Sequence, residues 1–315
     1  MPKVTVVVPN YNHEKFLKER IISILNQAFQ DFGLIILDDC STDDSRSIIE
    51  QFRSHPKVVK IVYNEVNSGS SFKQWKKGVE EAQSEYIWIA ESDDYSSSDF
   101  LLKALESMET KANADLFFCQ SYKVNADGEL IGDMNYWTSA ISSIDWEKPF
   151  FCEGKAFIEK ALTQRNVIVN ASAVLIRKNK IGTKLDEIMP YKMCGDWLFW
   201  AMVLQTGSIV YSPEKLNYFR SHDKTTRVRP SITDNLRYLA EEISVKQKIR
   251  KQVYTSKGKD DGTEWKNIFF LTTTNNYFFI LGLVKDLQLT TPANFKAKLF
   301  FYSLKHLVRK IIRGK

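Results

Sequence analysis

The chain has 315 residues, of which 43% are hydrophobic and 26% charged, an ordinary composition for a soluble globular protein with one large domain and an extension. Its four cysteines lie far apart and no histidines group with them, which argues against a zinc site or a disulfide framework and indicates a reducing cytoplasm. The formal charge of +6 is concentrated near the C-terminus and no nucleic-acid recognition module is visible, so we expect no nucleic-acid partner. No run of about 20 apolar residues could cross a membrane, and we expect a cytoplasmic protein.

Strand-like and helix-like runs alternate through the first hundred residues. The expected strands are apolar, often β-branched runs at 4–8, 34–37, 58–63 and 86–90, and the first of them is too short for a signal peptide. Helices are expected between them at 14–28, at 43–52 with Ser41 as N-cap, and at 72–82. This alternation predicts an α/β fold with a Rossmann-like, mainly parallel sheet flanked by helices.

Polar side chains follow each of these four strands. The groups are Pro9-Asn10-Tyr11-Asn12, then Asp38-Asp39, then Asn64 with Asn67-Ser68-Gly69, and finally Glu91 to Asp94. Ligands of open α/β sheets bind in the crevice outside the carboxyl ends of the strands. We therefore expect the active site along this edge.

The fourth strand ends at three carboxylates, Glu91, Asp93 and Asp94. Unpaired carboxylates at the edge of a core repel one another and resist desolvation. A divalent cation held by oxygen ligands would relieve that cost. The alternative is a solvated turn after a strand.

Three segments resemble family-2 glycosyltransferases. The first is 4–43, with Pro9, Tyr11, Asn12 and the string Asp38-Asp39-Cys40-Ser41-Thr42-Asp43. Glu91-Ser92-Asp93-Asp94 is similar to the acidic metal motif of that family, and Cys194-Gly195-Asp196-Trp197 resembles the segment that carries its catalytic base. The resemblance covers about 3–225 and implies the nucleotide-sugar-binding GT-A fold and transfer with inversion at the anomeric carbon.

The chain departs from the family pattern at three places. Cys40 stands where the family commonly has glycine, and Glu91 stands where aspartate is more frequent. The Arg-Asn pair often found before a helix glycine is replaced by Trp75-Lys76-Lys77-Gly78. This last difference leaves open how donor phosphates are held from that side, where Lys76 is a candidate.

The resemblance implies a nucleotide-diphosphate sugar as donor, with a UDP-sugar favoured. Tyr11 would stack on the nucleobase, and Asp39 would accept a hydrogen bond from a base N–H group. Asp38 is either a second nucleoside contact or a structural acid that orients the first loop. The remaining donor-binding candidates are Pro9, Asn12, Asn67 and Asp93.

The resemblance also implies a divalent cation, Mn²⁺ or Mg²⁺, on the leaving diphosphate. Asp94 is the first candidate ligand, Asp93 would contact ribose or metal, and Glu91 would support them. His222 is a further candidate for metal or phosphate, although a lone histidine is more often structural. Arg220, two residues earlier, could neutralise phosphate.

Asp196 is the candidate general base that takes a proton from the acceptor hydroxyl. The competing interpretation is a helix N-cap, because Asp196 begins an apolar helical run. The two interpretations differ for Asp196→Asn, since asparagine caps as well as aspartate but cannot accept the proton.

After about residue 226 the chain is predicted to be helical, with one helix at 232–253, so we expect a GT-A domain at 1–225 and a helical extension at 226–315. From residue 293 onward there are seven Lys or Arg residues and no acid, interleaved with apolar residues at helical spacing. A basic amphipathic helix of this kind either lies on an anionic membrane surface, here the inner face of the cell membrane, or packs on its own domain with a solvated basic face.

The leading hypothesis is a metal-dependent inverting glycosyltransferase of cell-surface polysaccharide synthesis that acts on a saccharide or lipid-linked saccharide acceptor. One alternative is a sugar-phosphate nucleotidyltransferase, although the Gly-rich N-terminal loop expected of that class is missing at 9–12. Another is a catalytically silent nucleotide-sugar-binding module at the membrane. Such a module would bind donor without turnover.

Overall fold

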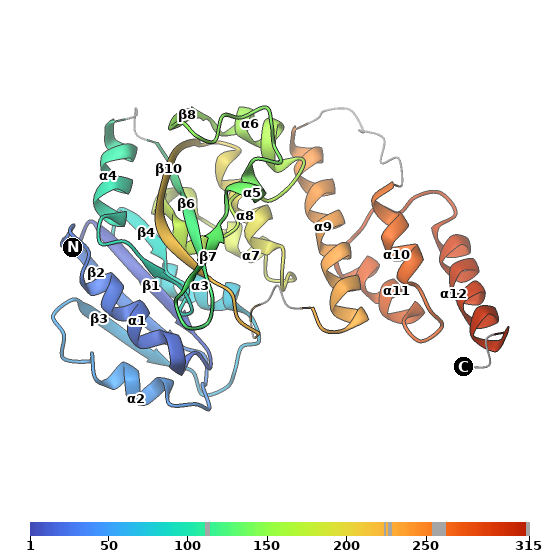
Figure 1. The fold of residues 1–315 in the computed structure, drawn as a ribbon, viewed down its shortest axis with the longest axis horizontal. Coiled ribbons are helices and arrows are strands. Elements are labelled where there is room, and N and C mark those ends of the chain that lie inside the picture. Colours follow the sequence, from blue (N-terminus) through green and yellow to red (C-terminus); the bar gives the residue numbers. More distant parts are fainter. Residues whose placement is uncertain (111–113, 224, 226–228, 254–262, 313–315) are drawn as a thin grey trace. The chain divides into compact units, whose positions relative to one another are not determined.

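The computed structural model describes residues 1–110, 114–223, 225, 229–253 and 263–312 (Figure 1). The chain forms two compact units. The first contains Met1–Met189 and Phe199–Asp223, and the second contains Pro190–Leu198 and Lys224–Lys315.

A ten-stranded sheet forms the centre of the first unit, in the order β3-β2-β1-β4-β9-β6-β10-β5, with β7 paired to β6 and β8 paired to β10. The strands are β1 Val4–Asn10, β2 Phe32–Asp38, β3 Val58–Tyr63, β4 Tyr86–Ile89, β5 Tyr95–Ser96, β6 Leu116–Val124, β7 Leu130–Asp133, β8 Phe150–Glu153, β9 Val174–Arg177 and β10 Ser208–Arg220.

The first four strands form the parallel part of this sheet. β1 pairs in parallel with β2 and with β4, and β2 pairs in parallel with β3. All residues of β1 and β2 are buried, as expected for strands covered by helices on both faces. The strand–helix alternation predicted from the sequence is confirmed here.

From β9 onward the sheet is mixed. β9 pairs antiparallel with both β4 and β6, whereas β6 and β10 pair in parallel over most of the length of β6. β10 also pairs antiparallel with the short strand β5. The α/β class is therefore as predicted, but the sheet is parallel mainly in its first half.

The helices alternate with the strands in the first unit and make up most of the second (Figure 1). They are α1 Glu14–Leu25, α2 Ser45–Glu50, α3 Ser71–Glu81, α4 Phe100–Thr110, α5 Asn135–Thr138, α6 Gly154–Phe157, α7 Lys184–Glu187, α8 Gly195–Leu204, α9 Ile232–Val253, α10 Lys266–Leu271, α11 Tyr277–Asp286 and α12 Phe295–Ile312.

Helix α3 packs closely on β1 at Gly78. A Cβ atom built on Gly78 would lie 2.2 Å from Cγ1 of Val7, which is closer than any side chain could be accommodated. Gly78 therefore sets how near α3 lies to the strand. This spacing places Trp75, one helical turn earlier, over the acidic end of β4.

The N-cap predicted for the second helix is wrong. Helix α2 begins at Ser45 with Asp44 as its N-cap residue. The hydroxyl of Ser41 is used elsewhere, because it accepts hydrogen bonds from the backbone N–H of Asn12 and from Nδ2 of Asn10. Ser41 therefore joins the loops after β1 and β2.

The second unit is built on α9, α10, α11 and α12. Trp265 is fully buried, and its ring meets that of Phe295, the first residue of α12, at a centroid distance of 4.9 Å. Phe295 also contacts the ring of Phe269 in α10, and Leu299 is fully buried. One face of α12 is thus packed against its own unit.

Candidate functional site

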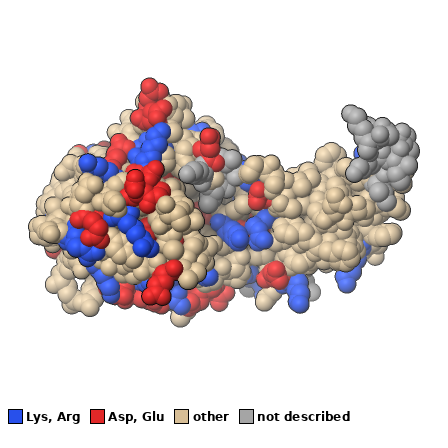
Figure 2. Space-filling view, turned by 90° about the horizontal axis from the view of Figure 1, so that it is seen from below, with Lys and Arg blue, Asp and Glu red and all other residues tan. Residues whose placement is uncertain are grey.

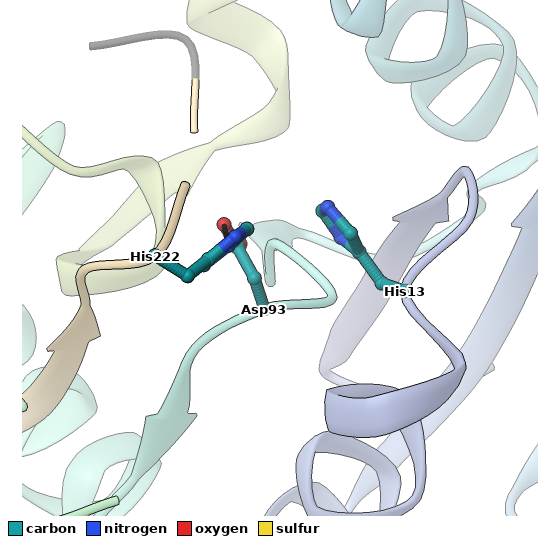
Figure 3. Close-up of side chains that lie close together, drawn as sticks. All are labelled: His13, Asp93 and His222. Atoms are coloured by element: carbon teal, nitrogen blue, oxygen red, sulfur yellow. Dashed lines mark hydrogen bonds and ion pairs between the residues drawn. The ribbon is translucent and has the colours of Figure 1, made fainter. Parts of the chain in front are cut away.

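Two histidines and one aspartate lie together at the carboxyl edge of the sheet (Figure 3). One ligand atom each from His13, Asp93 and His222 lies within 4.8 Å of the others. Nε2 of His222 is 3.1 Å from Oδ2 of Asp93. The three residues come from the loops after β1, β4 and β10, so the sheet topology assembles them from distant parts of the sequence.

The orientation of both imidazole rings is fixed by neighbours. Nδ1 of His13 is 2.8 Å from the hydroxyl of Ser92, in the same loop as Asp93. The ring of His222 contacts Phe16 of α1 at a centroid distance of 4.7 Å and meets His13 edge-on at 5.5 Å. Sequence reasoning followed the first loop only to Asn12 and missed His13, although its place after the first strand pointed to the same edge.

The three carboxylates of the loop differ in their surroundings. Burial raises the pKa of Asp93, but the hydrogen bond from His222 and the charges of His13 and His222 outweigh it, so this pKa lies below its usual value. Burial, with the charge of Asp93, raises the pKa of Glu91 to about 8 and that of Asp94 to about 6. Asp93 is therefore the carboxylate that the site holds most firmly as an anion.

A buried cation, Arg20 of α1, lies beneath this acidic loop. Its guanidinium carbon is 4.9 Å from the centroid of the Trp88 ring in β4, and the side chain is completely buried. None of its three side-chain nitrogens has a hydrogen-bond partner among the residues that the structure describes. Burial lowers the pKa of Arg20 to about 10, against the opposing charges of Asp94, Asp93 and Glu91.

Arg20 was also missed by sequence reasoning, which assigned its helix only an apolar face. The available signal was a charged residue at helical spacing between Leu17, Ile21 and Ile24, all three of which are fully buried. A charge on the buried face of a helix requires a compensating charge nearby.

Asp94 and Arg220 form a structural network. Oδ1 of Asp94 accepts from the backbone N–H of Arg220 at 3.0 Å, and Oδ2 accepts from Nδ2 of Asn170 at 2.8 Å. The guanidinium of Arg220 donates to the carbonyl oxygens of Asp93, Asn125 and Ala126 and pairs with Glu19. Arg220 is 2% exposed, and its nitrogens are occupied by these partners.

The structure thus places the predicted ligand Asp94 next to the His13–Asp93–His222 group but outside it. Both carboxylate oxygens of Asp94 already accept hydrogen bonds, and the residue is 2% exposed. Arg220, predicted to reach phosphate, instead ties the loop of Asp93 to the turn after β6. Asp94 and Arg220 therefore hold the loop of Asp93 in place through hydrogen bonds and are not directed into the His13–Asp93–His222 group.

Two departures from the family pattern touch one another. Nε1 of Trp75 donates to Oε1 of Glu91 at 2.7 Å, so the indole stands in direct contact with the acid that replaces the usual aspartate. Lys76, expected near phosphate, is directed elsewhere and forms an ion pair with Asp186 at 2.5 Å. From α3, the acidic loop therefore receives the indole N–H of Trp75 and not the ammonium group of Lys76.

The loops after β1 and β2 are joined by Asp38. Its carboxylate accepts hydrogen bonds from Nδ2 of Asn10, from the backbone N–H of Ser41 and from Nε of Arg46. This favours the structural role of Asp38 over a nucleoside contact. Cys40, which follows Asp39, has φ of +61°, the left-handed region that favours glycine, and this accounts for the glycine common at that position in the family.

Asp39 is the centre of a second network, which holds the loop before α3. Its Oδ1 accepts from Asn64, from the backbone of Ser68 and from Gln74, while its Oδ2 accepts from the hydroxyl of Ser68. Asn67 donates from Nδ2 to the backbone carbonyl of Asp39. Oδ2 of Asp39 therefore keeps more capacity for a ligand donor than Oδ1.

The first loop presents an aromatic ring at the same edge. Tyr11 is 45% exposed, whereas Pro9 is buried within β1. Asn12 adopts φ of +54°, and its Oδ1 accepts from the backbone N–H of Thr42 at 2.8 Å. The loop after β1 is thus held by the loop after β2, while the ring of Tyr11 is exposed to solvent.

Asp196 belongs to the second unit. Helix α8 begins at Gly195, so Asp196 lies within the first turn, and the N-cap interpretation does not describe its position. Its Oδ1 accepts from the backbone N–H of Trp197 at 2.8 Å. A carboxylate in the first turn is favoured by the helix dipole whether or not it has a chemical role.

Taken together, the first unit has a sheet edge that carries an acidic loop, two imidazoles and an exposed aromatic ring, which defines a ligand-binding α/β protein. Residues 5–166, more than half of the chain, match the family model described as glycosyl transferase family 2. The chain belongs to this family.

Three relatives illustrate the similarity. The chain is 36% identical over 116 residues to a Bacillus subtilis protein assigned as the teichuronic acid biosynthesis glycosyltransferase TuaG, 32% over 130 residues to the poly(ribitol-phosphate) β-N-acetylglucosaminyltransferase TarS of Staphylococcus aureus, and 31% over 113 residues to a β-1,3-glucosyltransferase of Campylobacter jejuni that acts on GalNAc(5)-diNAcBac-PP-undecaprenol. These segments cover 37%, 41% and 36% of this chain. They cover 46%, 22% and 35% of the relatives, so the chain spans less than half the length of each.

Solved structures show the fold. The crystal structure of residues 1–349 of Staphylococcus aureus TarS with UDP matches with a TM-score of 0.64 at 17% identity, covering 99% of this chain and 92% of that one. The complex of the same protein with UDP-GlcNAc gives the same TM-score. The GT-A fold predicted from the sequence is confirmed.

Proposed function

We propose that the chain is a metal-dependent inverting glycosyltransferase that moves a sugar from a UDP-sugar to an acceptor hydroxyl in cell-surface polysaccharide synthesis. The observation that carries this proposal is the His13–Asp93–His222 group at the carboxyl edge of the sheet in a chain of glycosyl transferase family 2. The names of the three relatives described above refer to teichuronic acid, poly(ribitol-phosphate) and an undecaprenol-linked saccharide. This supports a polymer or lipid-linked acceptor.

Uridine diphosphate is the proposed nucleotide of the sugar donor. TarS crystallises with UDP and with UDP-GlcNAc, and its fold matches that of this chain. In this chain, the exposed ring of Tyr11 would stack on the base, and Oδ2 of Asp39 would accept from a base N–H group. Pro9, Asn12 and Asn67 shape the loops around these two side chains.

The proposed cation ligands are Asp93, His222 and His13. A carboxylate oxygen and two imidazole nitrogens fit a divalent transition ion, and this mixed donor set favours Mn²⁺ over Mg²⁺, which prefers oxygen ligands alone. When bound, the ion would supply Lewis-acid stabilisation of the departing diphosphate. Asp94, Glu91 and Arg220 would hold the loop that carries Asp93.

Asp196 is the proposed general base. Its carboxylate takes the proton of the acceptor hydroxyl while that oxygen forms a bond to the anomeric carbon. The bond from this carbon to the diphosphate oxygen breaks on the opposite face, and the electron pair leaves with the diphosphate. This direct displacement inverts the anomeric configuration.

A donor panel with one variant tests the proposal. UDP-, GDP- and dTDP-sugars are incubated with Mn²⁺, and we expect turnover of a UDP-sugar that stops with EDTA and returns with Mn²⁺. Asp196→Asn should lower transfer by roughly 10²-fold or more while UDP binding persists. Activity untouched by EDTA would overturn the metal role, near-normal turnover of Asp196→Asn would overturn the base, and donor binding without any turnover would favour the silent module.

We also propose that the C-terminal helix contacts an anionic membrane surface. No helix among the described residues is long and apolar enough to cross a membrane. Helix α12 exposes Phe300, Phe301 and Leu304 to 59%, 60% and 45%, beside exposed lysines and with no acid from residue 293 onward. The face of the second unit seen in Figure 2 is largely uncharged, while the first unit shows acids and bases interspersed.

Vesicle binding tests this contact. Deleting the whole tail would also remove the packed residues Phe295 and Leu299, so the sharper variant is Phe300→Ser with Phe301→Ser. We expect the wild-type chain to sediment with phosphatidylglycerol vesicles but not with phosphatidylcholine vesicles, and the double variant to stay in solution. Equal sedimentation of wild type and variant would overturn the assignment of this helix.

A further inference from the structure

A buried glutamate of the second unit binds the backbone immediately before helix α8. Glu241 lies on α9 and is completely buried. Its Oε1 accepts from the backbone N–H of Lys192 at 3.0 Å, and its Oε2 accepts from those of Met193 and Cys194 at 2.8 and 3.0 Å. Three consecutive amides therefore point at one carboxylate.

The position of these amides explains why a carboxylate is suited to them. Helix α8 begins at Gly195, so the donors occupy the approach to its N-terminus, where backbone N–H groups lack helical partners. An anion there satisfies those donors and interacts favourably with the helix dipole. Among the described residues no ion pair involves Glu241, so its charge is compensated by backbone amides.

A second contact fastens the same segment to α9. The hydroxyl of Tyr191 is 2.7 Å from that of Ser244, and both side chains are buried. Ser244 follows Glu241 by three residues and so lies on the same face of the helix. The four residues 191–194 are thus attached to one face of α9 by a ring hydroxyl and three amides.

The attached segment immediately precedes α8, and Asp196 is the second residue of that helix. We propose that Glu241 is a positioning residue that fixes the backbone carrying Asp196, so that α9 of the C-terminal extension takes part in catalysis through this segment. The inference rests on the proposed role of Asp196 as general base. A base displaced by about 1 Å can lose up to roughly 10² in rate, so the effect is expected in turnover.

The matched pair Glu241→Gln and Glu242→Gln tests this in the full chain. Both change one glutamate of α9 to its neutral isostere, but the side chain of Glu242 is 26% exposed and pairs with Lys246. Glutamine at 241 would bring an amide N–H group against N–H donors. We expect kcat of Glu241→Gln to fall about 10-fold or more with the donor KM and the UDP Kd unchanged, partial recovery in Glu241→Asp, and wild-type kinetics in Glu242→Gln.

The double variant Asp196→Asn with Glu241→Gln separates this inference from the base assignment. If Glu241 acts through Asp196, the double variant is no slower than Asp196→Asn alone. Rate losses that multiply would overturn the positioning role while leaving the base in place. Near-normal turnover of Asp196→Asn would instead overturn the base itself.

Tyr191→Phe keeps the inference testable should Glu241→Gln fail to fold. This change removes a single hydrogen bond from the same segment, and we expect kcat to fall roughly threefold at an unchanged donor KM. An unchanged kcat in Tyr191→Phe, or a fall in kcat matched by weaker UDP binding, would overturn the positioning role.

Discussion

Two regions of the molecule bury negative charge, and they stabilise it in different ways. The acidic loop after β4 places Glu91, Asp93 and Asp94 together above one guanidinium, that of Arg20, which itself lacks hydrogen-bond partners among the described residues. Glu241 stands alone and accepts three backbone amides at normal distances. The first arrangement crowds three carboxylates around one cation, whereas the second gives a single carboxylate three backbone donors.

The difference indicates what each carboxylate is for. Burial, with the charge of Asp93, raises the pKa of both Glu91 and Asp94, and a bound cation is favourable in such an environment. A carboxylate surrounded by amides gains nothing from a cation and serves to hold the backbone in place. The two regions should therefore respond differently to Mn²⁺ when they are mutated.

The largest effect is expected from Arg20→Met. Removing the cation leaves buried carboxylates without their compensating charge, which should lower the free energy of unfolding by about 3–5 kcal/mol in EDTA. Mn²⁺ should recover more stability in this variant than it adds to the wild type, because the ion replaces the missing charge. Urea unfolding with EDTA and with Mn²⁺ measures both quantities.

Arg53→Met is the control, since Arg53 pairs with Glu50 at the exposed surface, where removing an ion pair should change stability little. If Mn²⁺ stabilises Arg20→Met no more than wild type, the acidic loop is not the cation site.

A smaller loss, about 2–3 kcal/mol, is expected for Glu241→Gln, because hydrogen bonds to a charged acceptor are replaced by weaker and partly mismatched ones. Unlike the loss in Arg20→Met, it should be the same in EDTA and in Mn²⁺. Thermal unfolding under the two conditions checks this. A metal-dependent loss would contradict the separation of the two regions.

At a pH above the Glu91 pKa of about 8, where the side chain is a carboxylate, Trp75→Phe should lower the free energy of unfolding by about 1.5 kcal/mol, because Glu91 loses the one N–H donor that reaches it from α3. Trp137→Phe is a matched control, since its Nε1 also donates at 2.7 Å but to the neutral carbonyl of Asn166. We expect a smaller loss there. Equal losses in urea unfolding would show that the charge of Glu91 contributes nothing to the bond.

Much of the fold could be predicted because its signals are local. The strand at 58–63 and the helix at 232–253 have the predicted bounds, and the strands that begin the sheet were found from their apolar runs. β10 was not predicted as a strand, because its pairing with β6 is non-local and shifts register between Ser212 and Asn217. The position of β9, antiparallel between β4 and β6, likewise depends on non-local pairing.

The site was predictable to a similar extent. Clustered acids after a buried strand and the resemblance of the first loop located the edge. The pairing of His222 with Asp93 depends on β10, however, and so required the three-dimensional structure. The contact between Trp75 and Glu91 is likewise a matter of packing, since α3 reaches the acidic loop only because Gly78 lets it lie close to β1.

The smallest expected effect concerns Ser92, whose hydroxyl lies 2.8 Å from Nδ1 of His13. Ser92→Ala should change the free energy of unfolding little but weaken Mn²⁺ binding by about 10-fold, because an imidazole ligand loses the contact that orients it. Electron paramagnetic resonance of free Mn²⁺ during a titration measures the affinity. Ser84→Ala is the control, since Ser84 is also a buried, hydrogen-bonded serine but precedes β4 at the opposite end of the strand. Unchanged Mn²⁺ affinity in Ser92→Ala would remove His13 from the ligand set and leave Asp93 and His222 as the proposed pair.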